Sequence, residues 1–160
     1  MKKLTKSLII IAAVILLIIA CAVCYLLGLR QGLRAGHLTA ELAEFTLMHQ
    51  HIDDQMANAN CPALKETLNE YLALLEKYKD FEHGLILSRT AYYGDKILTH
   101  ARLARIERKL GNEREAENHM KLAVEACKDH GWRDCSEDKI VSFTRKIEEE
   151  NPIGCLSNSK

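Results

Sequence analysis

Proline, glycine and aromatic side chains are scarce in this sequence. Its 160 residues include two Pro, eight Gly, one Trp, five Tyr and three Phe. Counts this low argue against a β-sandwich and against a disordered chain. Leu, Ala, Glu and Lys are abundant instead, and these residues favour helices, so we predict an all-α protein.

The sequence also lacks an excess of charge of either sign. It has 22 Lys and Arg against 22 Asp and Glu, and its formal net charge is zero. Lys2, Lys3 and Lys6 precede a long uncharged stretch, so residues 30–160 carry 19 basic and 22 acidic side chains. This balance excludes a broadly basic nucleic-acid-binding protein, and we expect no nucleic-acid partner.

Motifs typical of catalysis or cofactor binding are missing. The sequence has no Gly-x-Ser-x-Gly nucleophile motif and no phosphate-binding loop. Its seven His follow no metal-binding spacing, and His49 and His51 fall on different faces of a helix. Cys21 and Cys24 match Cys-x-x-Cys in form, but among aliphatic neighbours they are better interpreted as small apolar residues. We expect no metal, no cofactor and no enzymatic activity; an enzyme with scattered His and Cys is the less favoured alternative.

An uncharged apolar run extends from Ser7 to Leu29. At ~1.5 Å per helical residue, a run of this length crosses a hydrocarbon core ~30 Å thick. The apolar core of a signal peptide has only ~7–15 residues. We therefore predict a transmembrane helix over residues 7–29, in contact with the lipid bilayer, and a cytoplasmic tail over residues 1–6.

The charges that flank this run predict its orientation. Three Lys precede it, whereas only Arg30 and Arg34 follow it closely. Positive charge collects on the cytoplasmic side of a membrane. The layout looks bacterial, so we expect a single-pass inner-membrane protein with its N-terminus in the cytoplasm and its C-terminal domain in the periplasm.

A short motif inside the run suggests a different anchor. Residues 18–21, Ile-Ile-Ala-Cys, resemble a bacterial lipobox, and processing there would leave a lipid on Cys21. Residues 22–29 stay apolar, whereas a lipoprotein normally turns polar soon after its Cys. The uncleaved anchor is therefore favoured over the lipoprotein.

Small side chains recur at every fourth position across the end of the apolar run. They form a helix-packing stripe of Ala20, Cys24, Gly28, Gly32 and Gly36. Stripes of this kind let two membrane helices approach closely, which favours a homo-oligomer. The alternative is that the glycines loosen the joint between anchor and domain.

Helix-period patterns continue beyond the membrane. We predict a juxtamembrane helix over 30–58, a break before Pro62 and a helical domain over 62–150. Within that domain we expect a short helix near 81–92, a joint at Gly94 and a final helix from about 136 to 149. Asp134 and Glu137 can form a capping box at the start of the final helix. Residues 151–160 are predicted to be a flexible tail.

One segment of the domain has a distinctive pattern of small residues: Leu103-Ala104, Leu110-Gly111-Asn112, Glu115-Ala116 and Ala123-Val124. This pattern resembles a tetratricopeptide repeat, with one clear copy near 97–127. The resemblance implies two antiparallel helices that touch at Ala104, Ala116 and Ala123 and turn at Gly111. It also implies a protein-binding fold.

The resemblance is incomplete. Glu107 and His119 stand where such repeats usually have aromatic residues. Gly84 and Ala91 repeat the spacing of Ala116 and Ala123, which suggests a degenerate copy near 65–93. The whole chain also looks like single-span bacterial proteins that carry a small helical domain.

Four cysteines lie outside the apolar run. An even number of cysteines in an oxidising compartment indicates disulfides. Cys127 and Cys135 flank a short turn between two predicted helices, and we predict a disulfide between them. Cys61 and Cys155 remain as a second pair with weaker support. The alternative is four reduced thiols in a cytosolic domain.

Candidate partner contacts lie on the helical domain. They are the aromatic residues Tyr92, Tyr93 and Trp132 and the basic residues Arg102 and Arg105. Nearby glutamates could instead neutralise the basic residues, and the aromatics could be core.

These observations predict a membrane-anchored interaction or scaffold module that binds another bacterial envelope protein. The alternative is an accessory subunit of a membrane complex that associates through its transmembrane helix.

Overall fold

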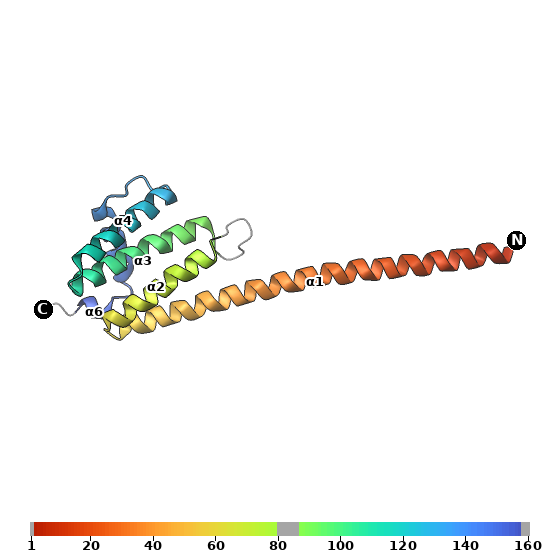
Figure 1. Ribbon diagram of the computed structural model, residues 1–160, viewed down its shortest axis with the longest axis horizontal. Helices are drawn as coiled ribbons and strands as arrows, with labels where there is room; N and C mark the ends of the chain where they lie inside the picture. The colour runs from red at the N-terminus through yellow and green to blue at the C-terminus, as the bar shows by residue number, and fades with distance from the viewer. Residues whose placement is uncertain (1, 80–86, 158–160) are drawn as a thin grey trace. The chain divides into compact units, whose positions relative to one another are not determined.

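The computed structural model describes residues 2–79 and 87–157, except for the side chains of residues 2–14, 34, 37 and 157 (Figure 1). Within these ranges all regular structure is helical, which confirms the predicted all-α class. The helices are α1 (Lys2–Ala57), α2 (Cys61–Lys77), α3 (Arg89–Lys109), α4 (Glu113–His130), α5 (Glu137–Glu148) and α6 (Gly154–Ser157).

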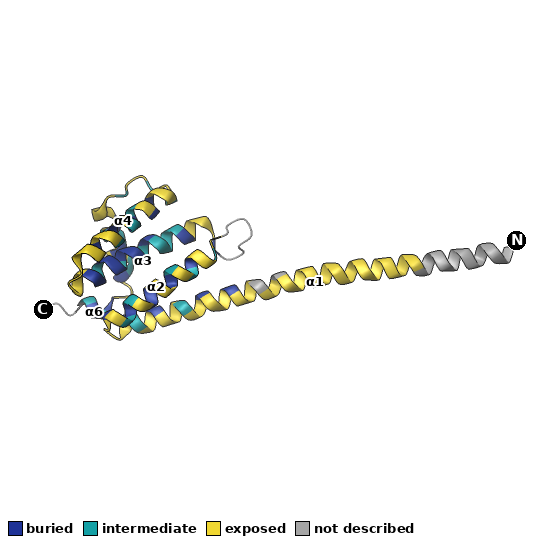
Figure 2. Cartoon of the chain, in the orientation of Figure 1, coloured by how far each residue is buried: buried dark blue, intermediate teal, exposed yellow. Residues whose placement is uncertain are grey.

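The chain divides into two units, Met1–Glu41 and Leu42–Lys160. The described side chains of α1 from Ile15 to Leu33 are all exposed, and most are apolar (Figure 2). This helix is long and apolar enough to cross a membrane. It is the one candidate membrane-spanning helix among the residues that the structure describes.

In the second unit, α3 and α4 form a helical hairpin (Figure 1). Gly111 between them has φ +83°, in the left-handed region that glycine adopts without strain. Its N–H donates to the Arg108 carbonyl at 3.1 Å, which closes the last turn of α3. Ala104, Ala116 and Ala123 have no exposed surface. The hairpin that the sequence predicts around Gly111 is therefore present.

Two apolar clusters form the core of the second unit. The first joins α1, α2 and α3 through residues that include Phe45, Ile52, Leu64, Leu68, Leu75, Leu103 and Ile106. The second joins α3, α4 and α5 through residues that include Ile97, Ala101, Met120, Ala126 and Ile140. Helix α3 contributes to both clusters, so it is the central element of the unit.

Local signals account for where α2 and α3 begin. Asn60 Oδ1 accepts a hydrogen bond from the Ala63 N–H at 3.1 Å, and Pro62 lies in the first turn of α2. Ser88 Oγ accepts from the Ala91 N–H at 3.1 Å. Each side chain satisfies a backbone donor that the helix leaves unpaired.

The predicted joint at Gly94 is wrong, because α3 runs unbroken from Arg89 to Lys109. A helical glycine costs about 1 kcal/mol, and burial of the neighbouring Tyr92 and Ile97 offsets this cost. Of the predicted helix over 81–92, residues 89–92 belong to α3, residues 87 and 88 are not helical, and residues 81–86 lie outside the described residues. Gly84, on which the degenerate repeat copy depends, lies outside the described residues.

The predicted capping box at α5 is replaced by a tighter turn. Asp134 Oδ1 accepts from the Ser136 N–H at 3.0 Å, and Ser136 is the N-cap residue. Aspartate readily bonds the backbone two residues ahead, and this arrangement wins here over a bond to Glu137.

Residues 151–157 are anchored, unlike the flexible tail predicted over 151–160. Ile153 is buried, and Cys155 is bonded to Cys61 at the start of α2. A Cβ atom added at Gly154 would lie 2.9 Å from the Met56 carbonyl oxygen, so glycine permits this close approach to the end of α1. The disulfide and the buried isoleucine together hold the segment against the domain.

Candidate functional site

The predicted partner contacts are largely internal. Tyr92 is buried, and its hydroxyl contacts the Glu76 carboxylate, so it is wrong as a surface contact. Tyr93 is half-buried, with its ring 4.9 Å from that of Tyr92. Trp132 packs edge-on against Phe143 with ring centroids 4.8 Å apart. These aromatic side chains contribute to packing within the domain.

Arg102 and Arg105 converge on one buried carboxylate, Glu148 of α5. Arg105 forms an ion pair with Glu148 Oε2, and Arg102 Nε lies 3.6 Å from Glu148 Oε1. Both arginines therefore contact Glu148 within the domain, and their role as partner contacts stays a prediction. Glu148 continues the buried positions Ile140 and Thr144 at a spacing of four, and this spacing is the sequence signal that could have identified it.

The five residues of the helix-packing stripe, Ala20, Cys24, Gly28, Gly32 and Gly36, are exposed on α1. Apart from the neighbouring backbone of the helix itself, no heavy atom of the described residues lies within 4 Å of a Cβ added at any of the three glycines. Cys21 and Cys24 are exposed thiols. The stripe thus presents open helix backbone within the first unit.

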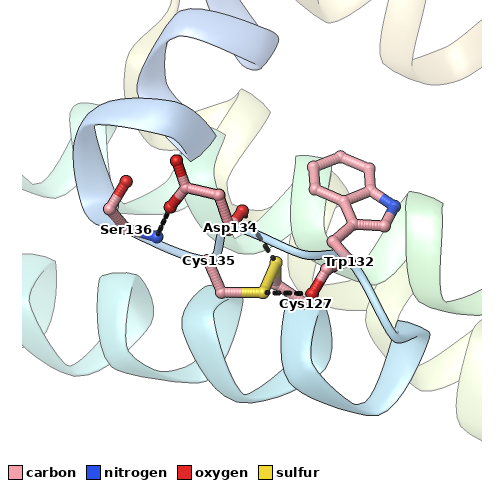
Figure 3. The surroundings of a disulfide bond; sticks show 5 residues. All are labelled: Cys127, Trp132, Asp134, Cys135 and Ser136. Atoms are coloured by element: carbon pink, nitrogen blue, oxygen red, sulfur yellow. Dashed lines mark hydrogen bonds between the residues drawn. A yellow bond between two sulfur atoms is a disulfide. The ribbon is translucent and has the colours of Figure 1, made fainter.

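Four cysteines of the second unit form two disulfides. Cys127 and Cys135 are bonded across the turn between α4 and α5, where carbonyl oxygens of Trp132 and Asp134 lie beside the sulfurs (Figure 3). Gly131, with φ +88°, ends α4 and starts this turn. Cys61 and Cys155 are bonded over a sequence separation of 94 residues. The second pair joins the start of α2 to the C-terminal segment.

An apolar groove of about 360 Å³ lies between α1 and α2. The groove is lined by Glu44, Leu47, Met48, His51 and Leu74. Leu47 is 65% exposed, an unusual state for a large apolar side chain in this unit. Glu44, at the edge of the groove, joins α1 to the end of α2. Its carboxylate accepts hydrogen bonds from Lys77 Nζ at 2.7 Å and from the Tyr78 hydroxyl at 2.8 Å. Both donors lower the pKa of Glu44.

A separate polar cavity of about 180 Å³ lies between α1, α2 and α3. Ile52, Leu68 and Leu98 form its apolar part. Its polar lining consists of His49, Asp53, Tyr71, Asp95, Thr99 and Arg102. Sequence reasoning named only Arg102 among the polar residues as a contact, because the other five are spread over three helices and match no motif.

Three of these residues form a directed hydrogen-bond chain. The Tyr71 hydroxyl donates to Asp95 Oδ2 at 2.7 Å and lies 3.1 Å from His49 Nε2. A phenol has one proton, so His49 Nε2 must carry the hydrogen of the second bond. Burial, followed by the charge of Asp95, raises the pKa of Tyr71 and keeps its proton in place.

The Arg102 guanidinium is buried but poorly satisfied. Its side chain is 11% exposed, and among the described residues Nε has no hydrogen-bond partner. Burial lowers the pKa of Arg102, and the nearby Glu148 carboxylate opposes this effect. A buried donor without a partner destabilises the fold, because its desolvation is not compensated. A hydrogen bond from this N–H to a ligand or to an ordered water would remove that cost.

A pair of histidines bridges α3 and α4. His100 Nδ1 and His119 Nδ1 lie 3.1 Å apart, so one ring donates and the other accepts. Burial, followed by the charges of His119 and Lys96, lowers the pKa of His100 to about 4, whereas Glu76 acts to raise it. Burial also lowers the pKa of His119. The pair is therefore neutral at pH 7.

This pair predicts a loss of stability in mild acid. His100 takes up a proton more readily in the unfolded chain, where its pKa is 6.5, than in the folded chain. Stability is therefore retained above pH 6.5 and falls until pH reaches about 4. Denaturant unfolding at pH 7 and pH 4.5 should show wild type losing about 2 to 3 kcal/mol more than His100→Gln. Equal losses in the two proteins would contradict this assignment.

Within residues 2–79 and 87–157, no three His, Cys, Asp or Glu side chains are arranged to hold a metal ion. No family model, curated protein or solved structure matches the chain. The groove, the cavity and the candidate membrane span are therefore the features of the chain that bear on its function.

Proposed function

We propose that this chain is a membrane-anchored, non-catalytic protein-interaction module of the bacterial cell envelope. Its N-terminal helix crosses the inner membrane with the N-terminus in the cytoplasm, and its helical domain lies in the periplasm. Three Lys before the apolar run support this orientation. The two disulfides fit an oxidising compartment, because cytosolic thiols are kept reduced.

The interaction surface is the apolar groove, and exposure of Leu47 is the observation that supports it. Leu47, Met48 and Leu74 offer apolar contacts between two helices, while Glu44 and His51 add polar groups. This combination suits the apolar face of an amphipathic partner helix. The membrane span raises the local concentration of the module beside other membrane-bound proteins.

Leu47→Asp should abolish partner binding without unfolding the domain. A charge in the groove opposes an apolar partner, whereas an exposed substitution typically changes stability by less than about 0.5 kcal/mol. Cells expressing the tagged full chain would be crosslinked, and the recovered partner quantified. We expect recovery to fall at least about tenfold, as for an interface hot spot.

Leu110→Asp is the matched control, because Leu110 is also an exposed leucine but lies at the end of α3. It should leave partner recovery unchanged. Equal recovery with wild type, Leu47→Asp and Leu110→Asp would contradict the groove as the interaction surface, provided that the three proteins melt at the same temperature.

The open stripe on α1 favours a second candidate function, that of an accessory subunit which associates through its membrane helix. The open space at Gly28, Gly32 and Gly36 supports helix–helix contact, including contact with a second copy of this chain. Replacing residues 7–29 by an unrelated span separates the two functions. Partner recovery should survive the replacement if the groove binds, and should be lost if the span binds. The apolar residues 22–29 after Cys21 support an intact anchor over a lipoprotein.

A further inference from the structure

The polar cavity contains a positive group, the Arg102 guanidinium, whose charge is only weakly compensated. Arg102 projects from α3, and its one ion pair with a described residue is the long contact of 3.6 Å with Glu148. Glu148 is more closely engaged by Arg105, which leaves Arg102 with weak compensation. A planar guanidinium presents several fixed donors, and a carboxylate is the acceptor that best matches them.

The same cavity contains an acceptor for a cation. Asp95 lies two turns before Arg102 on α3, and Tyr71 occupies only its Oδ2 atom. Among the described residues, Oδ1 of Asp95 accepts no hydrogen bond. Thr99 donates its hydroxyl hydrogen to the Asp95 backbone carbonyl at 2.7 Å, so its oxygen can still accept. These oxygens suit an ammonium group, which only donates.

The balance of charge selects the kind of ligand. Asp53 and Asp95 line the cavity with Arg102, and the charge of Asp53 is close enough to affect the Arg102 pKa. A simple anion would satisfy Arg102 but face two carboxylates, while a simple cation would face the guanidinium. A ligand with one charge of each sign satisfies both ends.

The volume of the cavity limits the size of the ligand. A void of about 150 Å³ admits benzene, so the cavity of about 180 Å³ admits roughly six to eight non-hydrogen atoms. We propose that the cavity between α1, α2 and α3 binds a small amino acid as its zwitterion, with the carboxylate on Arg102 and the ammonium on Asp95. Ile52, Leu68 and Leu98 then contact a short side chain.

Titration calorimetry on the detergent-solubilised full chain tests this proposal at pH 7. The probes are alanine, serine and proline, together with alaninamide, which lacks the carboxylate, and propionate, which lacks the amine. We expect saturable binding of at least one amino acid. For the alanine series, each truncated analogue should bind about 10- to 100-fold more weakly, as loss of a charge-assisted hydrogen bond implies.

Variants assign the two ends of the ligand. Arg102→Gln and Asp95→Asn should each weaken binding of the amino acid at least about tenfold. Arg108→Gln and Asp54→Asn are matched controls outside the cavity lining, and Arg108 pairs with the exposed Glu113 instead of with Glu148, so both variants should bind as wild type does. If Arg102→Gln impairs folding, the analogue series on the wild-type chain still decides the question.

Two results would overturn the proposal. One is no saturable binding of any of the three amino acids, which would leave ordered water as the content of the cavity. The other is equal affinity for propionate and alanine, which would indicate a simple anion site. Leu47→Asp should bind the amino acid normally, so failure of the groove and failure of the cavity are distinguishable.

Discussion

Replacement of Cys61 and Cys155 by serine is expected to lower the free energy of unfolding by about 4 to 5 kcal/mol. The disulfide closes a loop of 94 residues, and restriction of the unfolded chain increases with loop length. Its loss also releases the C-terminal segment, whose Ile153 is buried in the first core cluster. A loss of this size is a large fraction of the stability of a small domain.

Denaturant unfolding of the full chain in detergent, followed by the helical circular dichroism signal, measures this effect. Replacing Cys127 and Cys135 is the internal comparison, because that loop spans only eight residues and should cost about 2 to 3 kcal/mol. The test is which disulfide costs more unfolding free energy when it is removed, and we expect the larger loss for Cys61–Cys155. A larger loss for the short loop, or no loss for the long one, would show that the unfolded chain is not restricted in this way.

Removal of Glu148 has the second largest expected effect. Glu148→Ala leaves the guanidinium of Arg102 buried without its nearby carboxylate and takes away the ion pair of Arg105. Breaking a buried ion pair on one side costs about 3 to 5 kcal/mol, because the remaining charge is left uncompensated. We expect a loss of about 3 kcal/mol, since Arg105 is 24% exposed and can recover some hydration.

Glu149→Ala is the matched control for this variant. Glu149 is adjacent in sequence but exposed, so its removal should change the unfolding free energy by less than about 0.5 kcal/mol. Equal effects of the two substitutions in thermal and denaturant unfolding would mean that Glu148 does not compensate the arginines. Arg105→Gln should fall between the two.

Features fixed by near neighbours in sequence could be predicted. The helix end at Ala57, the start of α2 beside Pro62 and the turn at Gly111 each depend on residues within about four positions. Local backbone preferences decide these features, so the pattern of the sequence is sufficient.

Features that depend on distant residues could not be predicted in the same way. Glu148 lies 43 residues beyond Arg105, whereas the sequence offered that arginine only a partner contact or, as the alternative, glutamates nearby in the chain. The tail over 151–160 has the composition of a loose end, but its described part is held by Cys61 and by burial of Ile153. Only the tertiary packing brings these groups together.

The cavity and the groove depend partly on local sequence and partly on contacts between distant residues. The polar cavity takes His49 from α1, Tyr71 from α2 and Asp95 from α3, and no linear motif relates them. The apolar groove could have been inferred in part, since Leu47 and Met48 stand on α1 in a polar stretch. Its second wall, Leu74, is placed there only by the packing of α2 against α1.

The central claim is a membrane-anchored domain in an oxidising compartment, and cysteine labelling in intact cells tests it most directly. The full chain with Cys21 and Cys24 replaced by alanine would be treated with a membrane-impermeant maleimide, before and after an impermeant reductant. We predict that Cys61, Cys127, Cys135 and Cys155 react only after reduction. Reaction of these cysteines only after lysis, and without any reductant, would place the domain in the cytosol and contradict the account.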